Sequence, residues 1–163
     1  MSALVLDYSN EVRIDAPLRM VWSHLSDLNY ILQFIPERDD FEVAENGSHG
    51  SCHAVLVVGP LHIPMAINVE LGDLIVDEKV TFGCSIDALA TTLAMVITLR
   101  RASAQETAMR YSVHATVEHR LLGRLRGPLT ARLEDHVDGF CSNAAVFISR
   151  HAKAEERLLH LDD

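Results

Sequence analysis

Lysine, cysteine and long apolar runs are all scarce in this sequence of 163 residues, and each scarcity excludes a class of protein. Lys79 and Lys153 are the two lysines and the formal net charge is −9, which argues against a general nucleic-acid binder and against binding to anionic lipid by charge alone. No stretch approaches the roughly 18 apolar residues of a membrane span, and the first residues lack the basic start of a secretion signal. We therefore expect a cytoplasmic protein that binds no nucleic acid and has no transmembrane segment.

Cysteine and histidine occur without the motifs of common metal sites and catalytic centres. Cys52, Cys84 and Cys141 are widely separated and form no C-x-x-C pair, which is typical of free thiols in a reducing compartment. The sequence also contains no H-E-x-x-H, no G-x-S-x-G and no phosphate-binding glycine loop. We predict no metal, no cofactor and no catalytic residue, which favours a protein that is not an enzyme.

Residues 8–14 and most of residues 41–118 alternate between apolar and polar side chains, which is the period of a β-strand. Turn residues at Asn46-Gly47 and Gly59-Pro60 separate the first of these runs. One apolar and one polar face per strand is typical of an antiparallel sheet that is wetted on one side. The connections are short, so we expect consecutive strands to be neighbours.

Three other segments place apolar residues at helical spacing. Residues 18–28 follow Asp15-Ala16-Pro17, whose carboxylate we expect to cap a helix, and residues 29–34 predict a second short helix. Residues 128–159 predict an amphipathic helix about 45 Å long that starts at Gly127-Pro128 and whose final turns project. The whole pattern predicts one α+β domain over residues 1–163, with an antiparallel sheet of six or seven strands and a long C-terminal helix.

Two short motifs resemble the family of the carbon monoxide dehydrogenase G subunit, within the START-like or SRPBCC helix-grip superfamily. Phe34-Ile35-Pro36-Glu37 is similar to the family's apolar-Ile-Pro-Gly element, with Glu37 in place of the glycine, and Val58-Gly59-Pro60-Leu61-His62-Ile63-Pro64 resembles its Val-Gly-Pro turn. Residues 121–125 resemble the entry to its last helix more loosely. The sequence ends without the tail of many members, so we expect no membrane tether. The resemblance implies the helix-grip fold, a cavity for a hydrophobic molecule and an accessory role near a redox enzyme.

The inward faces of the predicted strands are apolar, and a sheet that grips one helix leaves space between them. Methionines on three neighbouring strands suit an adaptable pocket, because unbranched thioethers repack easily. Tyr111 is a candidate to orient a ligand, although a buried and satisfied hydroxyl explains it equally. The predicted cavity lining is Trp22, Phe34, Met65, Ile67, Phe82, Cys84, Met95, Ile97, Met109, Tyr111, Val113, Leu133, His136, Val137 and Phe140.

Three functions are compatible with these residues. The first is a carrier of a lipid, a quinone or a polyketide-like molecule, with a protein partner in a redox complex. The second is an enzyme similar to polyketide cyclases and aromatases, which requires His24, Tyr111 and His136 to converge in the cavity. The third is a protein-assembly module with a filled core and an exposed apolar patch at residues 158–161. A docking site for an acidic partner, or a solvated loop, explains the basic cluster of His119, Arg120, Arg124, Arg126 and Arg132.

Overall fold

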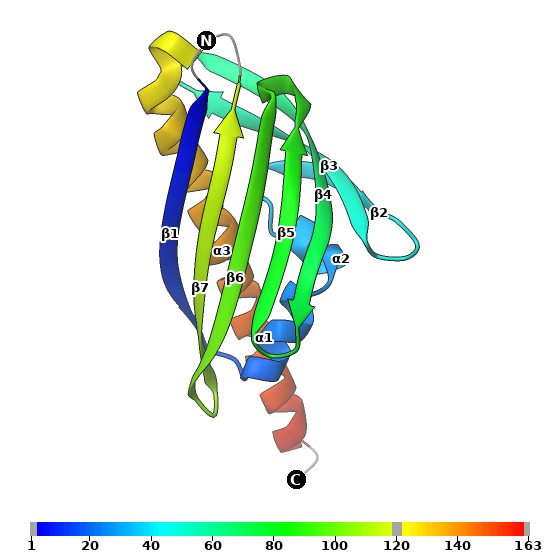
Figure 1. Ribbon diagram of the computed structural model, residues 1–163. Coiled ribbons are helices and arrows are strands. Elements are labelled where there is room, and N and C mark those ends of the chain that lie inside the picture. The colour runs from blue at the N-terminus through cyan, green and yellow to red at the C-terminus, as the bar shows by residue number, and fades with distance from the viewer. Residues whose placement is uncertain (1–2, 119–121, 162–163) are drawn as a thin grey trace.

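The computed structural model describes residues 3–118 and 122–161 (Figure 1). These residues form a seven-stranded antiparallel sheet in the order β1-β7-β6-β5-β4-β3-β2. The strands are β1 Leu4–Ile14, β2 Arg38–Val43, β3 His49–Val58, β4 Leu61–Ile75, β5 Lys79–Ile86, β6 Thr91–Ser103 and β7 Glu106–Val117. The helices are α1 Leu18–Leu25, α2 Leu28–Gln33, α3 Leu122–Leu161 and the short 3-10 helix η1 Asp87–Leu89.

Strands β2 to β7 form a continuous meander, which confirms that consecutive strands are neighbours, and β1 pairs with β7 at the other end of the sheet. The Gly59-Pro60 turn joins β3 to β4 directly, because Val58 pairs with Leu61. Gly59 has a φ of 57°, which a type II′ turn requires at its first central residue. Gly47 has a φ of 70° in the preceding turn, so both turns depend on a glycine that tolerates the left-handed region.

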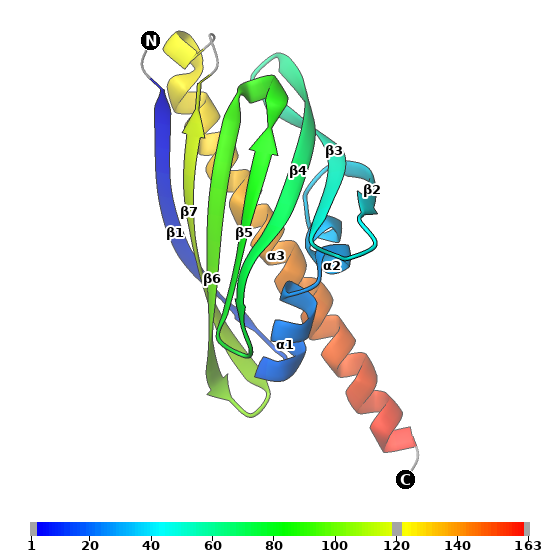
Figure 2. The ribbon, with the colours of Figure 1, turned by 45° about the vertical axis from the view of Figure 1, so that its right-hand side comes forward.

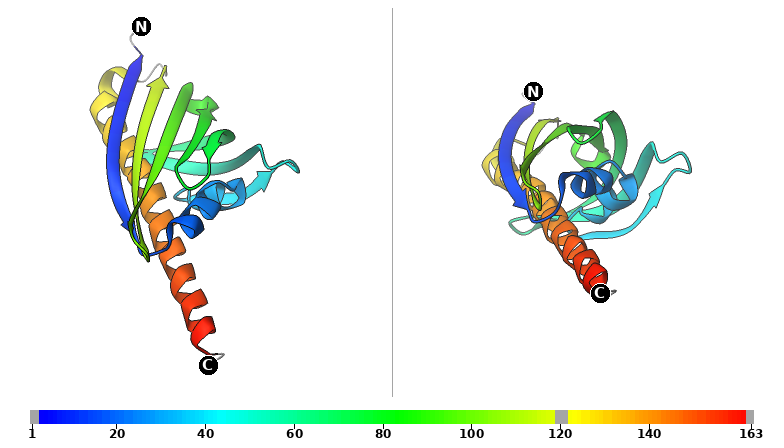
Figure 3. Two further views of the ribbon diagram at one scale, coloured as in Figure 1. Left: turned by 60° about the horizontal axis from the view of Figure 1, so that its bottom comes forward. Right: turned by 90° about the horizontal axis from the view of Figure 1, so that it is seen from below.

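The sheet curves around α1, α2 and α3, which lie on its concave side (Figures 2 and 3). Along β3 to β7 most of the inward side chains are buried, as Met65, Ile67, Ile97 and Met109 illustrate, while most of those between them are exposed or half-buried. Removing these apolar side chains from water stabilises the fold by about 25 cal/mol per Å² of buried surface. The core therefore lies between the concave face and the helices, as the alternation predicts.

The predicted cap of α1 is wrong. Pro17 occupies the N-cap position and makes no side-chain hydrogen bond to the helix. The Asp15 backbone N–H instead donates to Ser149 Oγ on α3 at 3.1 Å, which ties the end of β1 to the long helix. A carboxylate cap does occur on α2, where Asp27 accepts a hydrogen bond from the Asn29 N–H at 3.0 Å.

Helix α3 is longer than predicted, because Pro128 lies inside it rather than at its start. Gly127 precedes the proline, and a residue without a Cβ avoids part of the clash with the proline ring. Over its 40 residues α3 extends about 60 Å. Its last turns run past the sheet, where residues 153–159 are exposed (Figures 1 and 2). Neither α3 nor any other helix in the described part of the chain combines the length and apolar character needed to cross a bilayer.

Two strands begin earlier than the alternation predicts, β1 at Leu4 and β2 at Arg38. The pairing of β1 with β7 runs without interruption from Leu4 opposite Val117 to Ile14 opposite Thr107. The partner strand therefore sets the length of β1, and the local pattern of the sequence shows only part of it.

Candidate functional site

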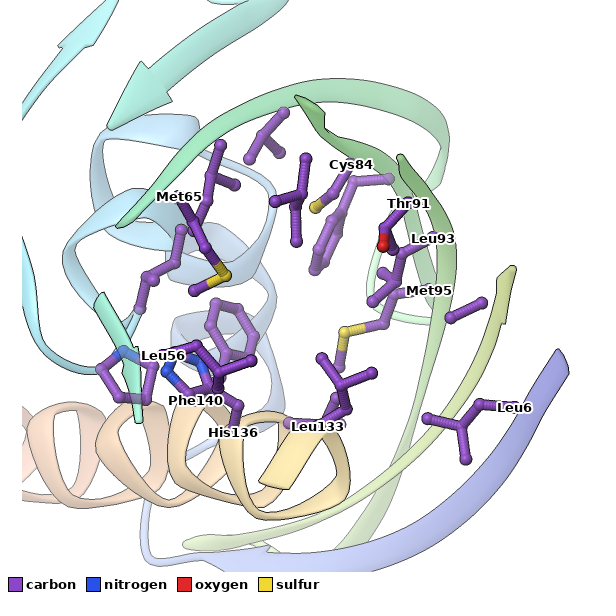
Figure 4. Close-up of a pocket in the computed structure, with 18 of the residues that line it drawn as sticks. Leu6, Leu56, Met65, Cys84, Thr91, Leu93, Met95, Leu133, His136 and Phe140 are labelled. Atoms are coloured by element: carbon purple, nitrogen blue, oxygen red, sulfur yellow. The ribbon is translucent and has the colours of Figure 1, made fainter. Parts of the chain in front are cut away.

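An apolar cavity of about 90 Å³ lies between the concave face of the sheet, α3 and the segment that follows α2 (Figure 4). Strands, helix and connecting segment all contribute side chains to it. Its lining consists of Leu6, Ile31, Ile35, Pro36, Leu56, Met65, Ile67, Val69, Phe82, Cys84, Ile86, Thr91, Leu93, Met95, Ala115, Leu133, His136, Val137 and Phe140.

The concave face of the sheet forms one side of the cavity, and the antiparallel register aligns the side chains on it. Directly paired residues of neighbouring strands point to the same face, so inward side chains align in rows across the sheet. One row of the lining crosses β4, β5, β6, β7 and β1 through Val69, Cys84, Leu93, Ala115 and Leu6. A second row crosses β4, β5 and β6 through Ile67, Ile86 and Thr91.

Helix α3 forms the side of the cavity opposite the sheet. Leu133, His136, Val137 and Phe140 follow one another at i, i+3, i+4 and i+7, which places them on one helix face toward the sheet. Leu133 lies toward Met95, whereas His136 and Phe140 lie further along α3 (Figure 4). The helix thereby presents one imidazole to a cavity that is otherwise lined mainly by hydrocarbon and sulfur.

The segment after α2 closes one end of the cavity with Ile35 and Pro36, and it packs tightly on α3. Gly139 permits this approach, because a Cβ at that position would come within 3.1 Å of Pro36 Cγ. Asn143 Nδ2 on α3 donates a hydrogen bond to the Phe34 carbonyl at 3.0 Å. The end wall is therefore held to the helix by one polar contact and by close packing.

Glu37 follows this segment with a φ of 56°, in the left-handed region that favours glycine. The resembling family pattern has glycine at this position. The turn out of α2 into β2 gives a physical reason for that glycine, because the chain reverses there through a conformation that a Cβ disfavours.

Three side chains of the lining carry a polar atom, and they differ in how it is satisfied. Thr91 Oγ1 donates to a backbone carbonyl at 3.1 Å. Burial raises the pKa of the Cys84 thiol to about 12, so this thiol is neutral at pH 7. His136 Nε2 is buried and has no partner within the described residues. Burial also lowers the pKa of this imidazole, an effect that Glu37 partly offsets and Arg132 reinforces, so the ring is neutral as well.

The structure brings nine of the fifteen predicted lining residues together around the cavity: Met65, Ile67, Phe82, Cys84, Met95, Leu133, His136, Val137 and Phe140. The other six do not belong to the lining: Trp22, Phe34, Ile97, Met109, Tyr111 and Val113. Ile97 and Met109 share the inward faces of their strands but are fully buried elsewhere in the core. Helix α1 packs against β5, β6 and β7 and fills part of the concave face that the alternation alone leaves open.

Ten residues of the lining fall outside the prediction. Val69, Ile86 and Leu93 belong to apolar faces that the alternation already identifies, so the signal for them was present in the sequence. Leu6 lies before the predicted start of β1. Ile35-Pro36 joins the lining only because the segment after α2 folds against α3, which no local pattern indicates.

Tyr111 does not face the cavity, because its hydroxyl is engaged by a carboxylate. It donates to Asp138 Oδ1 on α3 at 2.6 Å, and the Tyr8 hydroxyl donates to Asp138 Oδ2 at 2.6 Å. Burial and the bond to Asp138 raise the pKa of Tyr111 well above its usual value. Of the two explanations open for this residue, the structure shows the buried and satisfied hydroxyl.

His24 also lies outside the cavity, in an aromatic cluster between α1, α2 and α3. Its ring centroid lies 4.4 Å from that of Tyr30 and 5.2 Å from that of His151. Of the three side chains that a cyclase-like site requires, only His136 reaches the lining, so His24, Tyr111 and His136 do not converge.

The histidines of the first hairpin strands lie apart from the cavity as well. His49 and His53 on β3 and His62 on β4 are all exposed. Over residues 3–118 and 122–161, no three His, Cys, Asp or Glu side chains are placed to hold a metal ion together.

The basic cluster at the start of the last helix is described only in part. Arg126 donates to the Ala3 carbonyl at 3.2 Å, and Arg132 Nε donates to the Val57 carbonyl at 2.8 Å. These two side chains therefore bind the sheet. His119, Arg120 and the side chain of Arg124 lie outside the described residues.

A curved antiparallel sheet that encloses an apolar cavity against a long C-terminal helix defines the START-like, helix-grip class of proteins. A conserved protein from Geobacillus kaustophilus shares the fold with a TM-score of 0.74 and 13% identity, over 89% of this chain and 96% of that one. An aromatase/cyclase from a Streptomyces species matches with a TM-score of 0.68 and 14% identity, over 90% and 94%. A START superfamily protein from Mycobacterium smegmatis matches with a TM-score of 0.67 and 11% identity, over 88% and 97%.

The sequence identifies the family within this class. Residues 11–134 match the model of the CoxG family, the G subunit of carbon monoxide dehydrogenase, and the chain belongs to this family. No curated protein matches the chain significantly. The resemblance of the Ile-Pro and Val-Gly-Pro motifs to the CoxG family is thus confirmed, and so is the predicted helix-grip fold.

Proposed function

We propose that this protein binds and carries a hydrophobic small molecule in the cavity between its sheet and α3, as an accessory or maturation factor of a redox enzyme. The apolar cavity carries the proposal, because every lining residue except Thr91, Cys84 and His136 is purely apolar. Membership of the CoxG family supports the redox partner. A lipid, a quinone or a polyketide-like molecule fits this description of the ligand.

The size of the cavity bears on how such a ligand is held. Its volume of about 90 Å³ is below the roughly 150 Å³ of an engineered cavity that binds benzene, and below the roughly 300–1,000 Å³ of typical ligand pockets. A larger ligand therefore requires the lining to move outward. Met65 and Met95 are able to change rotamer at little cost. Residues 34–37 could also move away from α3 and so enlarge the cavity. We expect ligand binding to widen the gap between this segment and the helix.

The geometry supports binding better than cyclase-like catalysis. The Tyr111 hydroxyl is engaged by Asp138 and His24 lies elsewhere, which leaves His136 as the one described lining side chain of a type common in acid–base catalysis. General acid–base catalysis usually needs a second group to orient or complement the first. One imidazole in an apolar wall is better suited to holding a ligand.

The assembly-module hypothesis predicts a filled core and an exposed apolar patch, and the structure has only the second feature. Leu158 and Leu159 on the projecting turns of α3 are 63% and 73% exposed, and the side chain of Leu161 lies outside the described residues. The cavity shows that the core is not completely filled. We interpret the two leucines as a contact for the protein partner of a carrier.

Native mass spectrometry of the purified protein, followed by organic extraction, tests the carrier function directly. We expect an apolar molecule to co-purify at close to one per chain. Ala115→Leu is expected to remove it, because Ala115 is buried in the lining and a larger side chain fills the cavity. Ala94→Leu is the matched control, since Ala94 is exposed on the outer face of the adjacent strand.

The outcomes separate the hypotheses. A ligand that is present in the wild type and in Ala94→Leu but absent from Ala115→Leu supports a carrier that uses this cavity. A mass without ligand, together with no thermal shift from a panel of apolar compounds, contradicts the carrier function and favours an assembly module.

A further inference from the structure

This inference rests on the proposed function. The geometry points to the chemical class of the ligand, a largely apolar molecule with one uncharged oxygen. That oxygen, a carbonyl or a hydroxyl, forms a hydrogen bond with Nε2 of His136. An alkane-like ligand would leave that nitrogen unpaired, and a charged headgroup would find no counter-charge in the wall. The inference rests on which polar atoms of the lining already have a hydrogen-bond partner and which do not.

Among the lining side chains, only His136 offers a strong hydrogen-bonding atom that is not already used. Its Nε2 is buried and lacks a partner in the described part of the chain. Thr91 Oγ1 already donates to a backbone carbonyl, and the thiol of Cys84 is a weak donor. A buried polar atom without a partner is unfavourable, so a ligand oxygen that hydrogen-bonds to it gains more than the same oxygen gains against hydrocarbon.

The charges around His136 select an uncharged group. Among the described residues, no carboxylate, ammonium or guanidinium belongs to the lining. Glu37 is exposed to solvent, and the Arg132 guanidinium donates to the Val57 carbonyl at 2.8 Å and lies 3.8 Å from Asp135. A ligand carboxylate or ammonium would therefore lose its hydration in this cavity without a counter-charge to replace it.

The position of His136 also gives the orientation of the ligand within the cavity. Its half-buried side chain projects from α3, whereas Cys84 and Met95 lie on the sheet, across the cavity (Figure 4). The oxygen therefore lies near α3, and the hydrocarbon part of the ligand extends toward Cys84 and Met95.

Four probes of nearly equal size test the inference by NMR titration of the ¹⁵N-labelled full chain: ethylbenzene, acetophenone, 1-phenylethanol and benzoate. His136→Leu is expected to weaken the binding of acetophenone and of 1-phenylethanol about fivefold, the value of one ordinary hydrogen bond. The same variant is expected to change the Kd of ethylbenzene by less than about twofold. His136→Gln should keep most of the affinity for both oxygen probes, because its amide can hydrogen-bond. In the wild type, benzoate is expected to bind more weakly than acetophenone.

His114→Leu serves as the matched control, since His114 is exposed on the outer face of β7 and should affect no probe. The inference is overturned if His136→Leu weakens acetophenone no more than ethylbenzene, or if benzoate binds best; ethylbenzene binding would then still support the carrier function. If none of the four probes binds to the wild type, both the inference and the proposed function are overturned.

Discussion

The carboxylate of Asp138 links α3 to two strands of the sheet, and replacing it with alanine should destabilise the protein. It accepts hydrogen bonds from Tyr111 on β7 and from Tyr8 on β1, both at 2.6 Å. Such short bonds to a charged acceptor are stronger than bonds between neutral groups. One side chain on the helix thereby holds two neighbouring strands.

The two bonds differ in what replaces them in the variant. Tyr111 is only 3% exposed, so in Asp138→Ala its hydroxyl stays buried without a partner, at a cost of about 1–3 kcal/mol. Tyr8 is half-buried and regains water, so its bond contributes about 0.5 kcal/mol. We therefore expect the free energy of unfolding to fall by about 1.5–3.5 kcal/mol, a large share of the 5–15 kcal/mol typical of a domain.

Urea unfolding of Asp138→Ala, Tyr111→Phe and the double variant measures this contribution. We expect a coupling energy of about 1–2 kcal/mol between the two positions, and a smaller one between Asp138 and Tyr8. A loss below about 0.5 kcal/mol in Asp138→Ala, or strictly additive losses in the cycle, would refute the reasoning, because it would mean that water replaces both bonds.

Low pH should weaken the hydrogen bonds that join Asp138 to Tyr111 and Tyr8. Burial acts to raise the pKa of Asp138, but the hydrogen bonds from Tyr111 and Tyr8 outweigh it and hold the pKa below its usual value of 3.8. The folded state therefore binds fewer protons at this group than the unfolded state. Its contribution is complete above that usual value and is lost as the pH falls through the lower pKa of the folded state. Asp138→Asn should consequently lose less stability than the wild type between pH 5 and pH 3, measured by urea unfolding at each pH.

Two further predictions concern the backbone and the thiols. Glu37→Gly should stabilise the protein by about 0.5–1 kcal/mol, because the left-handed φ of 56° costs a residue with a Cβ about 1–2 kcal/mol and glycine loses about 0.5–1 kcal/mol more chain entropy on folding. Glu42→Gly, in the regular part of β2, is the control and should destabilise; an unchanged urea midpoint for Glu37→Gly would contradict the strain. Burial raises the pKa of all three cysteines, that of Cys84 to about 12 from 9.0, so the native protein should react with Ellman's reagent more slowly than free cysteine. Three thiols should react in urea, and fast labelling of Cys84 in the native protein would show that the cavity opens to solvent.

The fold was largely predictable because its main signals are local. Alternation over β4 to β7 identified the inward faces, since successive side chains of a strand point to opposite sides whatever their partners are. The apolar stripe of the last helix identified α3 in the same way. The signals that failed were those that depend on a partner, such as the start of β1, which its pairing with β7 sets.

The candidate site depends more on tertiary structure. Met95 and Ile97 are equivalent in the sequence, both apolar and both inward on β6, yet only Met95 lines the cavity. The difference arises because the space that remains is set by where α1 and α3 cross the sheet, which is a property of the packed molecule. Tyr111 was a candidate to orient a ligand because it combines an inward position with a polar hydroxyl, and the bond that this hydroxyl makes to Asp138 exists only in the folded structure.

The apolar faces, the helix-grip fold and the resemblance to the CoxG family could all be predicted before the structure was known, because they follow from the period and identity of neighbouring residues. Tertiary structure decided which inward residues leave a void, that the turn at Glu37 is left-handed, and that His136 alone brings an unpaired polar atom to the described cavity wall. Those properties depend on contacts between residues up to about a hundred positions apart, such as the bond from Asn143 to the Phe34 carbonyl, and such contacts leave no periodic trace in the chain.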